Sequence, residues 1–123
     1  MKILQRCVKL SRDMIDLPIG RCKHFSFLIE KNRIISIGYN QSYKTHPLSK
    51  KFGHRFSSIH SELHAISSFG KTNGLILANV RLDLNGNLRE SKPCQPCQKM
   101  LKYFNIQNVF YTIDNDWEFM QCF

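Results

Sequence analysis

The fold can be predicted outward from two short motifs, of which the first part is His60-Ser61-Glu62-Leu63-His64-Ala65-Ile66 and the second part is Ser91-Lys92-Pro93-Cys94-Gln95-Pro96-Cys97. Apolar residues recur at intervals of three and four from position 59 to 69, which predicts a helix around the first part. Ser57 or Ser58 is placed to cap this helix and Gly70 to end it. In the second part, Pro93 leads into a short predicted helix over 94–104. Leucine and β-branched residues over 75–84 predict a strand between the two helices.

The remaining elements surround this centre. Helical spacing of apolar residues predicts an amphipathic helix over 2–16. Two strands, 24–30 and 33–40, are separated only by Lys31-Asn32, which is typical of a tight hairpin. Further along the chain the pattern predicts a turn at 85–87, a strand over 108–113, a turn at 114–116 and an edge strand over 117–123.

This order of helices and strands predicts an α/β protein. The economical way to bury such a sheet is a three-layer α/β/α sandwich with a mixed central sheet, here ending in a C-terminal hairpin. The sequence has no internal repeat, low-complexity segment or domain boundary, so a single domain over 1–123 is expected.

Positive charge is concentrated in the first half of the chain. The 123 residues include 18 Lys and Arg against 9 Asp and Glu, a formal charge of +9, and the whole excess lies within residues 1–60. Positions 41–58 contain no acid and interleave aromatic residues with Lys44, Lys50, Lys51 and Arg55. This pattern suits a ligand that carries phosphates and stacks its bases. The alternative is a solvated basic loop whose aromatic side chains pack into the core.

The sequence also predicts the cellular compartment of the protein and the roles of its cysteines. No apolar run approaches the ~20 residues of a membrane span, and the start of the chain has no signal-peptide pattern, so we expect a soluble cytoplasmic protein. The chain has five cysteines. Cys94 and Cys97 form a C-x-x-C pair, which favours a metal site over a disulfide framework. Cys7, Cys22 and Cys122 are isolated and expected to be inert.

His60, Cys94 and Cys97 are the candidate metal ligands. Thiolates three residues apart in a first helical turn can point at a common centre, where the free N–H groups of the helix end favour their ionised state. Zinc suits one imidazole and two thiolates, and three protein ligands leave a fourth tetrahedral position for water. Glu62 would take a proton from that water as the catalytic base. The alternative is a closed structural zinc site, with His64 as a further ligand.

H-x-E followed by P-C-x-x-C is the signature of zinc nucleobase deaminases. From Phe25 to Phe123 the sequence resembles the cytidine deaminase-like superfamily, with Ser61 in place of the common Ala and His64 where nucleotide deaminases often carry Asn. Gly38-Tyr39-Asn40 resembles the turn whose Asn binds the sugar in nucleotide and tRNA deaminases, which implies a substrate-binding role for Asn40. Members of this superfamily are commonly oligomeric, so the resemblance also implies a dimer or tetramer.

The resulting expectation is a zinc-dependent hydrolytic deaminase that converts cytosine to uracil in a nucleotide or a single-stranded nucleic acid. Glu62 is the expected catalytic residue, and zinc is the expected cofactor. The expected substrate-binding residues are Asn40, Lys44, Lys50, Lys51 and Arg55. The alternative is a non-catalytic nucleic-acid-binding protein that keeps the fold and a structural zinc. Glu62 distinguishes the two, because a protein that only binds has no use for a carboxylate beside the metal.

Overall fold

A mixed β-sheet forms the centre of the molecule in a computed structural model, which describes residues 2–16, 23–40, 60–69 and 74–122. Five strands lie in the order β2–β1–β3–β5–β6, and the short β4 pairs with β3. Their bounds are β1 (Lys23–Glu30), β2 (Arg33–Tyr39), β3 (Ile76–Leu82), β4 (Leu88–Arg89), β5 (Asn108–Ile113) and β6 (Asp116–Gln121). β3 and β5 are parallel and the other pairs are antiparallel, as the predicted mixed sheet requires.

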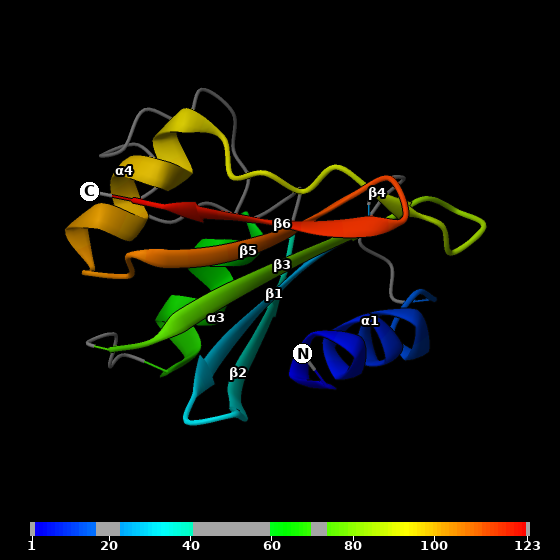
Figure 1. Cartoon of the computed structure of the whole chain (residues 1–123), viewed down its shortest axis with the longest axis horizontal. Coiled ribbons are helices and arrows are strands. Elements are labelled where there is room, and N and C mark those ends of the chain that lie inside the picture. The colour runs from blue at the N-terminus through cyan, green and yellow to red at the C-terminus, as the bar shows by residue number, and fades with distance from the viewer. Residues whose placement is uncertain (1, 17–22, 41–59, 70–73, 123) are drawn as a thin grey trace.

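Helices cover the two faces of this sheet. α1 (Lys2–Asp13) lies on one side, while α3 (Ser61–Phe69) and α4 (Gln95–Tyr103) lie on the other (Figure 1). Alternation along β1 separates the two cores: Phe25 and Phe27 pack in the cluster that contains α1, whereas Leu28 packs with residues of α3 and α4. The three-layer α/β/α arrangement predicted from the sequence is therefore confirmed.

The two hairpins match their sequence signals. Lys31 and Asn32 connect β1 to β2, with φ angles of 49° and 61°. Positive φ at both central residues is the geometry of a type I′ turn, whose twist matches that of the flanking strands. At the other end of the sheet, Asn115 has a φ of 65° between β5 and β6. β6 lies at the edge of the sheet, as expected for the C-terminal hairpin.

The helix of the first motif begins later than its apolar spacing suggests. α3 starts at Ser61, so His60 lies just before the helix, and the carbonyl of His60 accepts the first helical hydrogen bond from the N–H of His64 at 3.1 Å. The predicted capping serines and Gly70 lie outside the described residues. Because His60 precedes the helix, its side chain does not have to point in the direction that helical geometry gives to the side chains of α3.

β4 was missed by the sequence reasoning. After β3, the carboxylate of Asp83 accepts hydrogen bonds from the backbone N–H groups of Asn85 and Asn87, at 2.9 and 3.0 Å. This closed turn returns the chain so that Leu88 pairs with Leu82. A strand of two residues is too short to show a hydrophobic period, and only the turn that precedes it was visible in the sequence.

Gly38 brings β2 into direct contact with α3. A Cβ atom at this position would collide with the backbone of Ser61 and Ala65. Glycine therefore allows the strand and helix backbones to approach more closely than any other residue would. The close approach places Tyr39, which follows Gly38, against His64 of the helix that carries Glu62.

None of the helices in the described part of the chain is both long enough and apolar enough to cross a membrane.

Candidate active site

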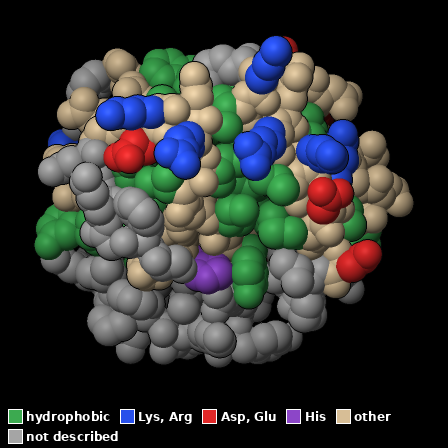
Figure 2. Space-filling view, turned by 90° about the horizontal axis from the view of Figure 1, so that it is seen from below, with side chains coloured by type: hydrophobic (Ala, Val, Ile, Leu, Met, Phe, Trp, Pro, Cys, Tyr) green, Lys and Arg blue, Asp and Glu red, His purple; other side chains and the backbone are tan. Residues whose placement is uncertain are grey.

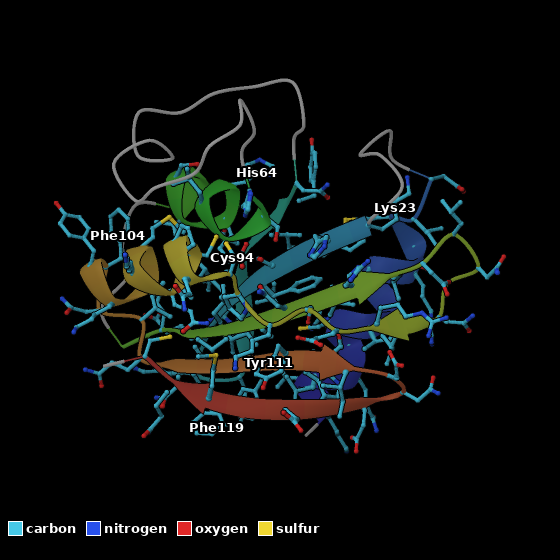
Figure 3. All side chains as sticks on the ribbon, turned by 90° about the horizontal axis from the view of Figure 1, so that it is seen from above. Lys23, His64, Cys94, Phe104, Tyr111 and Phe119 are labelled. Carbon is cyan, nitrogen blue, oxygen red and sulfur yellow. The ribbon has the colours of Figure 1, made fainter. Side chains whose placement is uncertain are left out.

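Two thiols at the start of α4 lie beside the ring of His60. Cys94 occupies the N-cap position with extended backbone angles of φ −65° and ψ 164°, and its side chain makes no capping hydrogen bond. His60 Nδ1 is 3.7 Å from the Cys94 sulfur and 3.4 Å from the Cys97 sulfur. Cys94 is exposed, whereas Cys97 is buried. In Figure 3 Cys94 lies where α4 begins, on the side of the sheet that carries α3 and far from Phe119.

The two thiols and the imidazole shift one another's pKa values. The pKa of Cys94 falls to about 4, first because the Cys97 thiol hydrogen-bonds to its thiolate and then because His60 does. The pKa of Cys97 is raised, mainly because its proton is held in that hydrogen bond and also because the thiol is buried. The hydrogen bond with Cys94 likewise raises the pKa of His60. The lowered pKa of Cys94 favours the thiolate, the form in which cysteine binds a metal.

The donor set fits zinc. The ligand atoms of His60, Cys94 and Cys97 all lie within 4.8 Å of one another, and they form the group of metal-binding side chains found among the described residues. With usual bond lengths, a tetrahedral zinc separates an imidazole nitrogen from a thiolate sulfur by about 3.5 Å. The two nitrogen–sulfur distances are close to this value. One imidazole and two thiolates also match the preference of zinc for nitrogen and sulfur ligands.

Glu62 is a buried carboxylate next to this group. Its side chain is 5% exposed, and the two oxygens have different partners. Oε1 accepts a hydrogen bond from Ser61 Oγ at 3.2 Å, and Oε2 accepts one from Asn79 Nδ2 at 3.0 Å. Glu62 also hydrogen-bonds to the Cys97 thiol and adds to the rise in its pKa. A carboxylate that is buried, oriented and beside a metal-binding group can serve as a proton acceptor there.

The sequence reasoning missed the polar network behind Glu62. Ser26 Oγ lies 2.7 Å from Ser61 Oγ and 2.6 Å from Asn79 Oδ1. Asn79 Nδ2 also donates to the backbone carbonyl of Ser91 at 3.1 Å. A signal for this network was present, because Asn79 and Ser26 interrupt apolar strands and a buried polar side chain requires partners.

His64 does not join the metal-binding group. Its Nδ1 accepts a hydrogen bond from the N–H of Tyr39 at 2.9 Å, and the two rings form an edge-to-face pair with centroids 4.6 Å apart. His64 therefore holds α3 against β2. This contact weighs against the alternative of a closed zinc site with His64 as a fourth ligand.

Asn40 closes the open end of the β1–β2 hairpin. Its Oδ1 accepts a hydrogen bond from the N–H of His24 at 3.2 Å, and its own N–H donates to the His24 carbonyl at 3.3 Å. Burial is the main cause that lowers the pKa of the His24 imidazole. The charge of Glu62 acts in the opposite direction and raises this pKa, whereas the charge of His60 lowers it further. Sequence reasoning had not singled out His24, which follows Lys23 at the start of β1. The expected sugar-binding role of Asn40 stays a prediction, and Lys44, Lys50, Lys51 and Arg55 lie outside the described residues.

Comparison with protein families agrees with this geometry. Residues 1–113 match the family described as the cytidine and deoxycytidylate deaminase zinc-binding region. The chain belongs to this family. Zinc is thus the cofactor of the family, and the group of His60, Cys94 and Cys97 can hold it. No curated protein matches the sequence significantly.

Solved structures of deaminases share the fold. The dCMP deaminase of the cyanophage S-TIM5 in its apo form aligns with a TM-score of 0.62 and 18% identity, over 94% of this chain and 86% of that one. The same enzyme in complex with dCMP and dUMP aligns with a TM-score of 0.60 and 17% identity, over 89% of this chain and 80% of that one. The cytidine deaminase of Mycobacterium leprae gives 0.56 and 17%, over 97% and 92%. The cytidine deaminase-like fold expected from the two motifs is confirmed.

Proposed function

We propose that this deaminase hydrolyses the exocyclic amine of cytosine in a phosphorylated substrate, either a nucleotide or a single-stranded nucleic acid. The observation that carries the proposal is the buried carboxylate of Glu62 beside the donor group of His60, Cys94 and Cys97. A zinc site that only stabilised the fold would gain nothing from burying a charged group next to it, because burial of a carboxylate costs free energy.

The mechanism assigns the proton transfers to Glu62. Zinc in this site would lower the pKa of a water molecule toward neutrality and polarise it for attack on C4 of the base. Glu62 accepts one proton from the water and delivers it to the ring nitrogen, and then carries the second proton of the same water to the departing amine. Water adds its oxygen to the ring and ammonia leaves, so cytosine becomes uracil with no other reactant. The hydrogen bond to Asn79 keeps Oε2 of Glu62 in place during these transfers.

Charge supports a phosphorylated substrate. The chain carries 18 Lys and Arg against 9 Asp and Glu, which a neutral nucleoside would not require. Figure 2 shows Lys and Arg side chains in a row across the side of the molecule on which α1 lies, with Asp and Glu beside them, so this row reflects the overall charge and is not assigned to the site. The structures aligned with this chain include a dCMP deaminase bound to dCMP and dUMP. The basic segment over 41–58 precedes His60 directly in the chain, so its cations are our candidates for phosphate contacts.

A panel of four substrates tests the reaction and its substrate class. The zinc-loaded protein is incubated with cytidine, deoxycytidylate, single-stranded DNA and tRNA, and products are detected by mass spectrometry as the change from an amine to a carbonyl oxygen. We expect turnover of deoxycytidylate or of one polynucleotide, and much slower turnover of cytidine. Turnover of cytidine alone would contradict the phosphorylated substrate, and conversion of adenine would contradict the assignment of cytosine. Zinc binding without turnover of any substrate would favour the non-catalytic alternative.

The salt dependence of binding separates a polynucleotide from a nucleotide. Each phosphate contact on a single strand adds about 0.7 to the slope of log affinity against log salt. Replacing Lys44, Lys50, Lys51 and Arg55 by Ala should therefore lower the slope for a fluorescent oligonucleotide by about 3 if all four contact phosphates. A mononucleotide has too few phosphates to show this change.

The matched control removes the same charge elsewhere. Lys2, Arg6, Lys9 and Arg12 are exposed on α1, which lies on the face of the sheet opposite α3 and α4. Replacing these four residues by Ala should change the slope much less than the replacements in the 41–58 segment. An equal effect of both sets would mean that the affinity reflects net charge alone. No binding at low salt would leave a free nucleotide as the substrate.

A further inference from the structure

A buried asparagine at the centre of the sheet holds the Glu62 carboxylate. Asn79 lies on β3, and its side chain is 2% exposed. Its Nδ2 donates two hydrogen bonds, to Glu62 Oε2 at 3.0 Å and to the Ser91 carbonyl at 3.1 Å. Its Oδ1 accepts one from the hydroxyl of Ser26 at 2.6 Å. The amide therefore uses both of its N–H groups and its oxygen on named partners.

The partners leave the amide a single orientation. A backbone carbonyl can only accept, so the Asn79 group that faces Ser91 must be the NH₂. The second hydrogen of that NH₂ then points at Glu62. Rotation of the amide by a half turn would place Oδ1 against the Ser91 carbonyl and the Glu62 carboxylate, so three acceptors would face one another without a hydrogen. The donor offered to Glu62 is thus set by the fold and not by the protonation of a neighbour.

Asn79 also joins the two halves of the site. Glu62 lies on α3, two residues after His60, and Ser91 precedes Cys94 by three residues. The Ser91 hydroxyl donates to the carbonyl of Asn79 at 2.9 Å, and the Ser91 N–H donates to Thr112 O on β5 at 2.9 Å. β3 lies between β1 and β5 in the sheet, so Asn79 itself stands on a rigid support. One side chain therefore links the carboxylate to the segment that delivers the thiols.

We propose that Asn79 is a positioning residue, which holds the Glu62 carboxylate in the one rotamer that is useful beside the metal group. The inference rests on the proposed function, because it assigns Glu62 the proton transfers. A neutral amide suits the task. The amide gives the buried carboxylate a charge-assisted hydrogen bond and brings no positive charge of its own. An arginine or a lysine at this position would add a positive charge that offsets the charge of the carboxylate. An apolar residue at position 79 would leave that carboxylate oxygen buried without its donor.

The experiment compares Asn79→Ala and Asn79→Asp with the wild type. Ala removes the donor, and Asp keeps the shape but replaces the two N–H donors by carboxyl oxygens, at most one of which carries a proton. Groups that orient a catalytic or metal-binding side chain are typically worth about 10- to 100-fold in activity. We expect kcat to fall by about this factor in both variants while KM changes by less than about threefold, with zinc content unchanged. If Asn79 served only to fill space, Asp would keep more activity than Ala.

Val80→Ala is the matched control for stability. Val80 is the next residue on β3 and is fully buried, but it packs in the cluster that contains α1, on the face of the sheet opposite Glu62. Alanine leaves a cavity there and does not touch the hydrogen bonds around Glu62. We expect a lower melting temperature, similar to that of Asn79→Ala, with kcat close to the wild-type value. If Asn79→Ala and the control variant lost kcat equally, the proposal would be overturned, because lower stability alone would then explain the loss.

A second measurement does not depend on turnover. The chain has a mass of 14.4 kDa, which suits nitrogen-15 NMR of side-chain amides. We expect the Asn79 NH₂ signals to exchange slowly with solvent and to shift when Glu62 is replaced by Gln. Unshifted signals would overturn the contact itself. If the wild type deaminates no substrate but the signals shift, the proposed function fails and the hydrogen bond stands. If the wild type is active and both Asn79 variants keep full kcat, the positioning role fails and the function stands.

Discussion

Glu62→Gln should keep the fold and the zinc and lose turnover almost completely. Gln has the size of Glu, and its carbonyl can still accept the hydrogen bond that Asn79 Nδ2 donates to Oε2. What it loses is the ability to accept and return a proton. General acid–base catalysis is usually worth ~10²–10⁴-fold, and Glu62 would serve more than one proton transfer, so we expect kcat to fall by at least ~10⁴-fold. Ammonia release and the zinc content of the same sample are the measurements.

The control for this variant removes a carboxylate outside the site. Glu90 is exposed on the segment that follows β4. Glu90→Gln makes the same change of charge, and we expect it to keep wild-type turnover. Loss of zinc from Glu62→Gln would contradict the assignment, because it would make Glu62 a metal ligand and favour a closed structural site. Retained turnover would remove Glu62 from the mechanism.

Cys97→Ala should release the zinc and weaken the link between α3 and α4. Cys97 is fully buried, and its sulfur lies 3.4 Å from His60 Nδ1. Its removal leaves two protein donors, too few for a stable zinc site. Metal that binds only the folded chain stabilises it by about 4 kcal/mol at a thousand times the dissociation constant. For a domain of this size that is roughly 10 °C or more in melting temperature. Elemental analysis and thermal unfolding measured by circular dichroism report both effects.

Cys7→Ala provides the matched control for Cys97. Cys7 is also fully buried, but it lies on α1 across the sheet, where burial raises its pKa to about 12. Both substitutions remove a buried thiol and leave a cavity of similar size. We therefore expect Cys7→Ala to lose some stability and to keep about one zinc per chain. Full zinc occupancy in Cys97→Ala would contradict the metal site described here. A chelator should lower the melting temperature of the wild type and of Cys7→Ala, but not that of Cys97→Ala.

The hairpin turns, α1 and β5 show why much of the fold could be predicted. Three features depend on neighbours a few residues away and so leave a local pattern: the Lys31-Asn32 turn, the apolar spacing of α1, and the run of β-branched and aromatic residues in β5. The start of α3 could not be found in this way, because apolar positions continue to Ile59 while the helix begins at Ser61. β4 was missed because its pairing with Leu82 follows from the turn at Asp83 and leaves no period of its own.

The kind of chemistry can be inferred from the sequence alone, because a histidine, a glutamate and two cysteines stand in an order that resembles one superfamily. Residue type and spacing are enough for this, because ligand preference and acid–base capacity belong to side chains. The contacts of these groups follow from the tertiary fold instead. His60 Nδ1 lies 3.7 and 3.4 Å from the two sulfurs, His64 contacts Tyr39, and Asn79 donates a hydrogen bond to Glu62. These contacts join residues 17 to 37 positions apart, and sheet register and helix packing set such distances.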